Sequence, residues 1–398
     1  MKIAMRVVSF CHYLQGPACT QYLADMGADV IKIEPLKGAF ERHWSGAKSY
    51  VEGVSAFLLA ANRNKRSLAV DLKNPEGREI VLRLIDKADA VVENFRPGVL
   101  DRLGLGFEAV RARKPDIIYA SASGLGASGP AASRPGQDLL MQARSGLIAA
   151  TGGGDSGPAV VGAAVVDQHG GALLAMGILG AYVRKLQTGI GARVEANLLG
   201  AGIDLQSEAL TMYFAAPNRR DLLPRDRHIG SWYHDAPYGL YLLADCRIVL
   251  SMNDPKKLAD ALDCETLRGL ANIDRYAERD RYARAVADAL RNRRFAEVAA
   301  VFETHGIWYE RVQSYEDLRS DPQAIHNETF REVTIRGKAT TLINHPLRYD
   351  GKVPAFQGVP LEQGADSLEL LAELGYSADE QRRLVNGGVV GIAQKEVA

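Results

Sequence analysis

The sequence predicts an α/β protein with a parallel sheet in a large domain and a second, smaller α+β domain. In the first half of the chain, short runs of β-branched residues alternate with stretches of helical length. Strands that alternate with helices of this length form βαβ units, which place the strands parallel in one sheet. The alternation ends near Pro217, where the charged and aperiodic residues 218–230 indicate a linker or loop.

The predicted strands of the first half are apolar runs bounded by turn residues. A turn at Gly16-Pro17 precedes the first predicted helix. Asn74 can cap a second helix, Pro75 fits its first turn, and Glu76 suits its positive end. The strands themselves are predicted at residues 7–10, 28–34, 67–72, 88–95 and 116–121.

The later segments carry a different mixture of patterns. Apolar stretches rich in Ala and Gly predict closely packed helices at residues 137–152 and 170–185. Residues 237–252 indicate a hairpin and residues 280–305 a pair of helices, which together suit a small α+β domain. From about residue 314 the strand patterns return, and an exposed helical tail follows.

The charge balance gives no sign of a polyanionic partner. Lys plus Arg and Asp plus Glu both number 48, so we expect binding neither to nucleic acid nor to an anionic membrane. No apolar stretch reaches the roughly 18 residues of a membrane helix, and the N-terminus lacks the pattern of a signal peptide. Four cysteines in so long a chain indicate reduced thiols. A cytoplasmic protein is therefore expected.

Common cofactor and nucleophile motifs are absent. The turn after the first strand, residues 13–18, holds one glycine and a proline where a dinucleotide fold needs GxGxxG. No P-loop, HExxH helix or GxSxG elbow occurs, and the eight histidines are scattered. We therefore expect no metal site and no tightly bound cofactor.

Asp167 is the only formal charge within residues 161–176, an apolar stretch of small residues. The pattern predicts a buried strand before it and a helix that begins near Gly170. The N–H groups of that helix would keep the carboxylate ionised, and the glycines would let a substrate approach closely. Asp is also a favoured N-cap, so a purely structural role is an alternative, and the two roles are compatible.

Several long stretches resemble one family of enzymes. They are GPACTQYLADMGADVIKIE (16–34), NKRSLAVDLKNPEGRE (64–79), ADAVVENFRPGVLDRLGLG (88–106), GAAVVDQHGG (162–171) and TGIGARVEANLLGA (188–201). By these ordered matches, the chain is identified as a member of the class III CoA-transferases, the group that includes formyl-CoA transferase and carnitine CoA-transferase.

The resemblance implies a Rossmann-like large domain built from both ends of the chain, a small domain from the later middle, and a homodimer of interlocked chains. The implied boundaries are residues 1–216 and 326–398 for the large domain and 217–325 for the small domain with its linker. It also implies coenzyme A and acyl-CoA as substrates, with small carboxylic acids as the other reactants.

The resemblance further implies that Asp167 is the catalytic aspartate. Backbone N–H groups of Gln15 and Gly16 are candidates for stabilising the oxyanions of acyl transfer. The implied coenzyme A contacts follow successive strands, where α/β sheets bind ligands, and their basic members would hold the phosphates, although each of these also suits a solvated surface. These contacts are Leu14, Gln15, Val70, Lys73, Asn94, Phe95, Arg96, Arg102, Leu103 and Arg134.

Removed from bulk water and aligned with a thioester, Asp167 would attack acyl-CoA. A mixed anhydride and then an aspartyl-CoA thioester would form before coenzyme A reaches the acceptor acid. Succinyl-CoA is a candidate donor, since the family commonly uses it. A dicarboxylate acceptor is suggested by the arginines of the loop, which could equally form a solvated surface; they are Arg219, Arg220, Arg225 and Arg227.

The first departure from the family is the lack of the Gly-rich run that covers the intermediate in formyl-CoA-type members. This argues against formyl-CoA as the substrate. Four residues of the segment 228–239 are alternative candidates for lining the site, namely Gly230, Tyr233, His234 and Tyr238.

The second departure concerns the acyl-CoA racemases of the same fold. Gln137 stands where those enzymes have a catalytic His, and glutamine cannot exchange a proton at neutral pH. His169, two residues after Asp167, is the nearest histidine in the sequence, and His12, Gln137 and His169 are further candidate substrate contacts. Racemase or isomerase activity, including transfer of coenzyme A within one molecule, and a non-catalytic CoA-binding protein are the alternatives.

Overall fold

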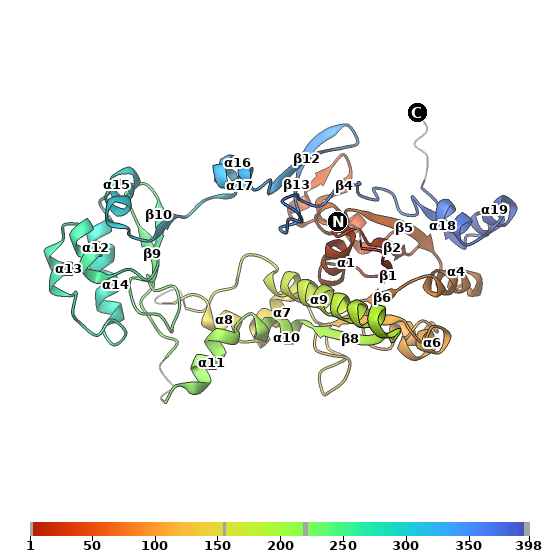
Figure 1. Cartoon of the computed structure of the whole chain (residues 1–398), viewed down its shortest axis with the longest axis horizontal. Helices are drawn as coiled ribbons and strands as arrows, with labels where there is room; N and C mark the ends of the chain where they lie inside the picture. Colours follow the sequence, from red (N-terminus) through yellow and green to blue (C-terminus); the bar gives the residue numbers. More distant parts are fainter. Residues whose placement is uncertain (1–2, 154–156, 218–221, 394–398) are drawn as a thin grey trace. The chain divides into compact units, whose positions relative to one another are not determined.

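The computed structural model describes residues 3–153, 157–217 and 222–393, and its helices and strands are labelled in Figure 1. The chain forms two compact units. The first comprises residues 1–141, 164–202 and 322–398, and the second comprises residues 142–163 and 203–321. The predicted division into domains at residues 216 and 325 stays a prediction.

A seven-stranded sheet forms the centre of the first unit. Six of its strands are parallel, and β14 pairs antiparallel with β5 at the edge. Counted along the chain, the parallel strands follow the order 3-2-1-4-5-6, as in doubly wound nucleotide-binding folds. The strands, in sheet order, are β14 (Val390–Gly391), β5 (Lys65–Val70), β2 (Asp29–Glu34), β1 (Arg6–Phe10), β6 (Ala90–Glu93), β7 (Ile118–Ser123) and β8 (Ala192–Asn197).

Helices cover both faces of this sheet (Figure 1). On one face, Val8 of β1 belongs to a core with α4, α6, α18 and α19; on the other, Val7 belongs to a core with α1 and α9. This alternation follows from the strand period of two. The helices are α1 (Gln15–Asp25), α4 (Pro75–Asp86), α5 (Val99–Arg102), α6 (Phe107–Arg113), α9 (Val165–Thr188), α18 (Ser367–Glu373) and α19 (Ala378–Asn386).

Shorter elements connect and flank these layers. They are α2 (Phe40–His43), the 3-10 turn η1 (Gly46–Lys48), β3 (Tyr50–Val51), β4 (Val54–Ser55), α3 (Ala56–Ala61), α7 (Asp138–Arg144), α10 (Leu198–Asp204), α17 (Pro322–His326), β12 (Phe330–Ile335) and β13 (Lys338–Ile343). The predicted N-cap at Asn74 is confirmed, because its side chain accepts the N–H of Glu76 at 2.9 Å.

Several predicted boundaries were wrong. Gly16 and Pro17 lie inside α1, where a proline in the first turn interrupts no helical hydrogen bond. The predicted helix over residues 137–152 is divided into α7 and α8 (Leu147–Ala150) at Gly146, which has a φ of 87°. The C-terminal tail is not simply exposed, because Leu370 and Leu371 of α18 are fully buried in the core.

The second unit contains the predicted hairpin and helical pair. Strands β9 (Gly239–Leu242), β10 (Arg247–Leu250) and β11 (Tyr309–Arg311) form an antiparallel sheet. The helices are α8, α11 (Ser207–Ala215), α12 (Pro255–Ala261), α13 (Glu265–Gly269), α14 (Arg279–Leu290), α15 (Phe295–His305) and α16 (Tyr315–Ser320). In the part of the chain that the structure describes, no helix combines the length and apolarity needed to cross a bilayer.

Candidate active site

The order of the parallel strands reverses between β1 and β6, so the loops after these two strands flank a crevice where such sheets bind ligands. Here the Asn94 side chain accepts the His12 N–H at 2.9 Å and donates to the His12 carbonyl at 2.6 Å. The rings of His12 and Phe95 lie 4.8 Å apart. The structure therefore brings together three predicted contact residues from two segments about eighty positions apart.

The loops after β1 and β6 form one corner of the candidate site, and Gln15 and Gly16 lie between this corner and α9. A Cβ on Gly16 would lie 2.6 Å from the Cys11 sulfur and 3.1 Å from the Asn94 side chain, so only glycine fits there. A Cβ on Gly170 of α9 would lie 2.8 Å from the Gln15 Nε2 atom. That amide nitrogen is buried and has no hydrogen-bond partner among the residues that the structure describes. The first turn of α1 thus offers a side-chain donor beside its backbone N–H groups.

Asp167 lies in the first turn of α9, one turn before Gly170. Residues 157–164 form no continuous strand before it, and the helix begins at Val165 rather than near Gly170, so both expectations were wrong. The N-cap position is Ala164, so the alternative in which Asp167 is itself the cap is wrong. Instead, Oδ1 of Asp138 accepts the N–H groups of Val166 at 2.8 Å and Asp167 at 3.0 Å.

This arrangement changes the acidity of Asp167. Burial and the nearby Asp138 carboxylate raise the pKa of the half-buried Asp167 from its ordinary value of 3.8 to about 7. The expectation that helix N–H groups keep Asp167 ionised was wrong, because two of them donate to Asp138. A carboxylate with a pKa near neutrality is a more basic nucleophile than one that ionises at pH 4.

The remaining predicted coenzyme A contacts occupy varied positions near the carboxyl ends of the strands. Leu14 and Val70 are buried in the apolar core, while Leu103 is partly buried against it. The basic residues are all exposed: Lys73 before α4, Arg96 after β6, Arg102 at the end of α5, and Arg134 in the loop that follows β7. The basic residues therefore have room to meet phosphate groups, and Val70 could offer only its backbone.

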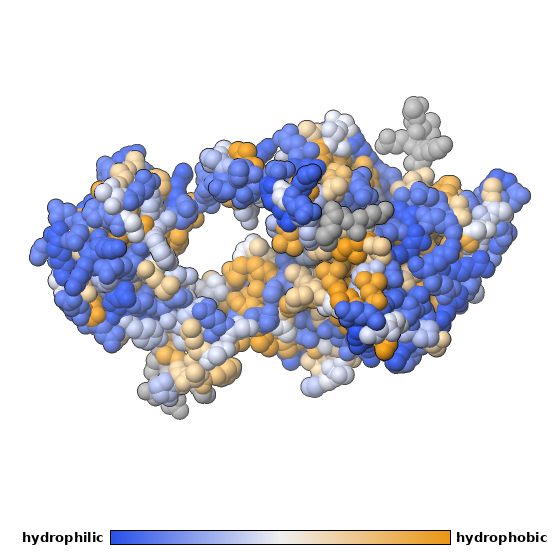
Figure 2. All heavy atoms as spheres, in the orientation of Figure 1, coloured by the Kyte–Doolittle hydropathy of each residue, from blue (hydrophilic) through white to orange (hydrophobic). Residues whose placement is uncertain are grey.

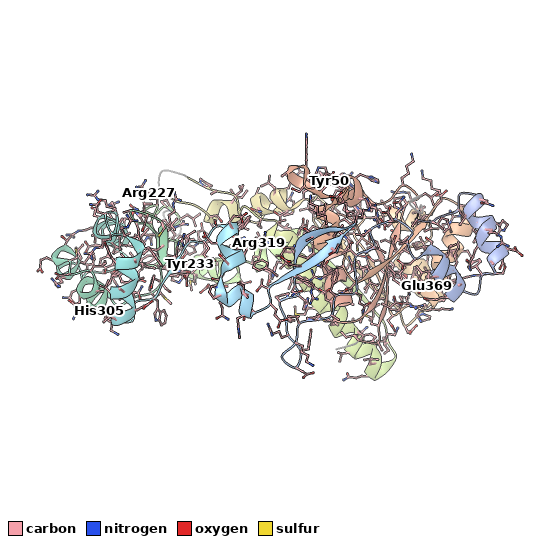
Figure 3. The ribbon with its side chains drawn as sticks, turned by 90° about the horizontal axis from the view of Figure 1, so that it is seen from above. Tyr50, Arg227, Tyr233, His305, Arg319 and Glu369 are labelled. Carbon is pink, nitrogen blue, oxygen red and sulfur yellow. The ribbon has the colours of Figure 1, made fainter. Side chains whose placement is uncertain are left out.

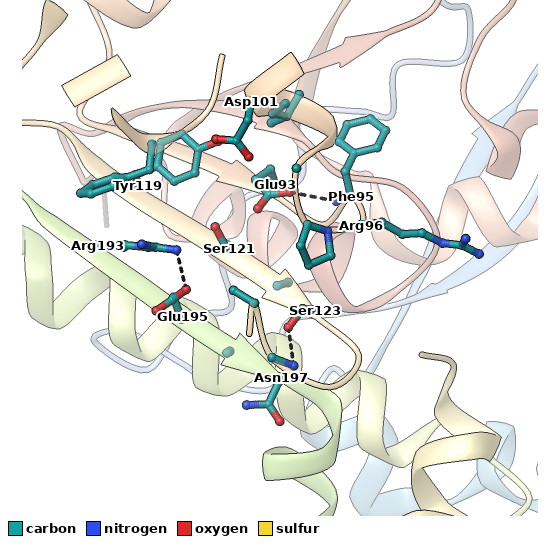
Figure 4. A pocket seen from close by; sticks show the side chains of 18 residues that line it. Glu93, Phe95, Arg96, Asp101, Tyr119, Ser121, Ser123, Arg193, Glu195 and Asn197 are labelled. Atoms are coloured by element: carbon teal, nitrogen blue, oxygen red, sulfur yellow. Dashed lines mark hydrogen bonds and ion pairs between the residues drawn. The ribbon is translucent and has the colours of Figure 1, made fainter. Parts of the chain in front are cut away.

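A cavity of about 200 Å³ lies at the carboxyl ends of β6, β7 and β8, beside this corner (Figure 4). Phe95 and Arg96 line it, together with the half-buried Glu93, whose Oε2 accepts the Phe95 N–H at 2.9 Å. Desolvation raises the pKa of Glu93 above its ordinary value. Asp167 is not among the lining residues, so this cavity is separate from the candidate nucleophile.

Gly230, Tyr233, His234 and Tyr238 come together in one turn of the second unit. The His234 and Tyr238 rings stack at 4.1 Å, and the Gly230 N–H donates to the Tyr238 carbonyl at 2.9 Å. The Tyr233 hydroxyl donates to Glu208 at 3.2 Å; Tyr233 is labelled in Figure 3. These four residues form one local cluster, and their role as site residues stays a prediction.

His169 and Asp167 lie on different sides of α9. His169 is two residues after Asp167 in α9, and side chains at that spacing project from different sides of a helix. Gln137 is exposed and directly precedes the capping residue Asp138. Within α9 as the structure describes it, no histidine therefore lies on the same side of the helix as Asp167.

Two groups of residues were missed from the sequence. Asp138 stands out there only as a neighbour of Gln137, and the sequence gives no local sign of a cap to a helix 28 residues away. A series of aromatic rings beside His12 was also missed. Its signal was available, because Tyr13 and Phe40 follow predicted strands where ligand contacts are expected.

Comparison with known proteins gives a consistent result over nearly the whole chain. The model of CoA-transferase family III matches residues 4–366. The chain is 30% identical to an acyl-CoA transferase of Fusarium pseudograminearum, over 97% of this chain and 87% of that protein. It is 31% identical to a succinate–glutarate CoA-transferase of Agrobacterium fabrum, over 93% and 94%.

A solved structure agrees with these matches. The crystal structure of a CAIB/BAIF family protein from Brucella suis superposes with a TM-score of 0.79 at 27% identity, over 93% of this chain and 98% of that one. The predicted family resemblance is confirmed, and the chain belongs to CoA-transferase family III.

Proposed function

We propose that this enzyme transfers coenzyme A between two carboxylic acids through covalent intermediates on Asp167. The observation that carries the proposal is a half-buried carboxylate with a raised pKa in the first turn of α9. One turn later, Gly170 packs against the N-terminal turn of α1, which holds the buried Gln15 amide. The N-terminal part of α9, which holds the proposed nucleophile, thus packs against the turn of α1 that holds the proposed donors, at the sheet edge expected to bind ligand.

The proposed reaction has four acyl transfers. The Asp167 carboxylate attacks the acyl-CoA carbonyl, which gives a mixed anhydride and releases the CoA thiolate. The thiolate attacks the aspartyl carbonyl, so the donor acid leaves and an aspartyl-CoA thioester forms. The acceptor carboxylate attacks this thioester, which gives a second anhydride and again releases the CoA thiolate. The thiolate then attacks the acceptor carbonyl of that anhydride. Acceptor-CoA leaves and Asp167 is regenerated.

Each of these transfers passes through an oxyanion that needs donors. We propose that the Gln15 Nε2 amide and the N–H groups of Gln15 and Gly16 fill this role. Helix N–H groups in the first turn have no partner within their own helix, and the Gln15 amide is already desolvated. Donors that are fixed before the reaction stabilise developing negative charge without reorganisation.

We keep the coenzyme A contacts as part of the proposal. Asn94 holds the loop of His12 in place, and Phe95 presents a ring beside it. The exposed Lys73, Arg96, Arg102 and Arg134 would meet the phosphates.

The proposed dicarboxylate acceptor has less support. Arg225, one of the arginines behind that idea, is buried, and its guanidinium donates to the backbone carbonyls of Leu223, Ile229 and Ala150. Arg219 and Arg220 lie outside the described residues. A relative named succinate–glutarate CoA-transferase still makes succinyl-CoA a suitable first donor to assay.

We also propose that two copies of the chain associate. The exposed side of α9 carries small and apolar residues in helical register, at Ala172, Met176, Gly180 and Val183. Figure 2 shows hydrophobic residues gathered around this helix. An apolar stripe of this kind suits close helix packing against a second copy.

Analytical sedimentation of the wild type and of Met176→Glu measures the association of the two copies. The charged variant should shift the protein toward the monomer.

The central test traps the acyl-enzyme. Purified protein incubated with succinyl-CoA and hydroxylamine should form a hydroxamate at Asp167, detected by intact mass and peptide mapping. Asp167→Asn should give no hydroxamate and lose CoA transfer by at least about 10³-fold, as for other covalent nucleophiles. A racemase would instead exchange an α-proton for deuterium without an adduct. Full turnover by Asp167→Asn would disprove the proposal.

A further inference from the structure

A continuous row of aromatic rings crosses the carboxyl ends of β6, β1 and β2. Successive ring centroids lie 4.8, 4.8, 4.8, 5.7 and 5.2 Å apart, within the range of direct aromatic contact. We call this set the aromatic row, and its members in spatial order are Phe95, His12, Tyr13, Phe40, Trp44 and Phe57.

The backbone holds the aromatic row in a fixed conformation. Tyr13 has a φ of 62°, a left-handed conformation that a non-glycine residue adopts at some cost and that occurs often at functional sites. The Ser55 hydroxyl donates to the Trp44 carbonyl at 2.7 Å. Tyr50, labelled in Figure 3, donates to the carbonyl of the adjacent His43 at 3.2 Å. The rings are therefore presented by an ordered scaffold.

Three members of the aromatic row face solvent in the single chain. Tyr13 is 47% exposed, Phe40 43% and Trp44 47%. Single exposed apolar residues are common, but neighbouring exposed rings in mutual contact are typical of a surface that binds a ligand or another protein.

Both ends of the aromatic row reach the proposed site. Phe95 directly follows Asn94, the residue that holds the His12 loop. At the other end, Phe57 packs on a small apolar cluster that includes Leu14, just before Gln15, and Ala164, three residues before Asp167. The Phe57 end of the row therefore lies near the first turn of α9, and the Phe95 end lies among the proposed coenzyme A contacts.

Two buried cations of this region, Arg42 and Lys32, are already engaged. The guanidinium of Arg42, on α2, contacts Glu34 at 2.6 and 2.7 Å and donates to two backbone carbonyls. The Lys32 ammonium pairs with Glu41 at 2.5 Å, and both are buried. Neither is available to receive the second carboxylate of a short diacid.

We propose that the exposed rings of the aromatic row, Tyr13, Phe40 and Trp44, bind the acyl group and that the substrate acid carries an aromatic ring. This inference rests on the proposed function, because it assumes that the acyl group is delivered to Asp167. Rings of the substrate would pack offset or edge-on against Trp44, Phe40 and Tyr13, as aromatic pairs prefer.

The test compares two donors in the trapping reaction, which needs no acceptor acid. Rates of hydroxamate formation are measured for phenylacetyl-CoA and succinyl-CoA with wild type, Trp44→Ala and Phe40→Leu. We expect the wild type to prefer phenylacetyl-CoA by at least about tenfold, the scale of an apolar contact in a substrate pocket. Trp44→Ala should lower the phenylacetyl rate by about tenfold and leave the succinyl rate within about twofold.

Trp308→Ala is the matched control, because Trp308 is 64% exposed in the second unit and lies outside the aromatic row. It should change neither rate. Phe40→Leu keeps an apolar side chain and is the more conservative test of the same surface. Equal or faster trapping of succinyl-CoA by the wild type would overturn the inference, as would equal loss for both donors in Trp44→Ala and Phe40→Leu. If neither phenylacetyl-CoA nor succinyl-CoA gives a hydroxamate at Asp167, the proposed function itself is overturned.

Discussion

The first turns of α9 and α12 are both closed by an aspartate carboxylate that accepts two backbone N–H groups. In α12 the carboxylate belongs to its own N-cap, Asp254, whose Oδ1 accepts the N–H groups of Lys256 at 2.8 Å and Lys257 at 3.0 Å. Those hydrogen bonds lower the pKa of Asp254.

In α9 the same two hydrogen bonds go to Asp138, a residue from another segment. Asp167 follows in the first turn, beside the Asp138 charge and in a partly buried setting, and its pKa rises to about 7. The comparison shows that a helix N-terminus stabilises the carboxylate that receives its N–H groups and not every carboxylate near it. The position of Asp167 in the helix therefore does not determine its protonation.

The largest expected difference between the two helices is in how the free energy of unfolding depends on pH when the aspartate Asp167 or Asp254 is replaced. Asp167 has a raised folded-state pKa, so its cost to folding is absent below about pH 4 and fully present above pH 7. Asp167→Asn should therefore gain about 2 to 4 kcal/mol of unfolding free energy at pH 8 and little at pH 4.5. Asp254→Asn, with its lowered pKa, should instead lose a little stability at pH 8. Urea unfolding at the two pH values measures both, and a loss in Asp167→Asn at pH 8 would contradict the assignment.

The second prediction concerns the packing that positions α9. A Cβ on Gly171 would lie 2.8 Å from the Gln15 carbonyl oxygen and 3.2 Å from the Cys19 backbone nitrogen, neither of which can move freely. Gly171→Ala should cost about 1 to 3 kcal/mol, as overpacking usually does, and should lower acyl-enzyme formation by displacing the first turn. Gly269→Ala in α13 is the control, since a Cβ at that position would meet no atom within 4 Å. Thermal unfolding and trapping rates distinguish the two variants.

The third prediction isolates the charge of Asp138. Asp138→Asn keeps an oxygen that can accept the N–H groups of α9 but removes the negative charge next to Asp167. The acid limb of the pH profile of acyl-enzyme formation should then shift down by about one unit, so trapping at pH 6 rises several-fold relative to the value at pH 8. Asp254→Asn should leave the profile in place. An unchanged profile in Asp138→Asn would mean that burial alone raises the pKa.

The sequence alone predicted those parts of the fold that depend on the local pattern of residues. Runs of β-branched residues located five of the six parallel strands and missed β8. The family resemblance supplied Asn94 and Phe95, which meet the further candidate His12 in the structure. The strand predictions worked because the strand period is a property of short segments.

The parts that failed depend on contacts between distant segments. The cap of α9 comes from Asp138, which no local pattern predicts. The aromatic row collects rings from several separate segments, and only the positions of Tyr13 and Phe40 after predicted strands pointed to it. The start of α9 was also misplaced, because the apolar residues around Val165 suit a strand as well as a helix. Neither the burial of Asp167, which is the larger cause of its raised pKa, nor the nearby Asp138 carboxylate can be read from the local sequence.

The smallest expected effect concerns how much Asp138 and Asp254 each stabilise the helix that they cap. Asp138→Ala and Asp254→Ala each remove a carboxylate that accepts two backbone N–H groups, so each should cost about 1 kcal/mol at pH 5. At pH 8 the variants should diverge, because removing Asp138 also relieves its repulsion of the ionised Asp167 and offsets part of the loss. Urea unfolding at both pH values resolves this difference. If the two variants lose the same stability at pH 8, the charge of Asp138 does not act on Asp167, and the contrast between the two helices reduces to burial.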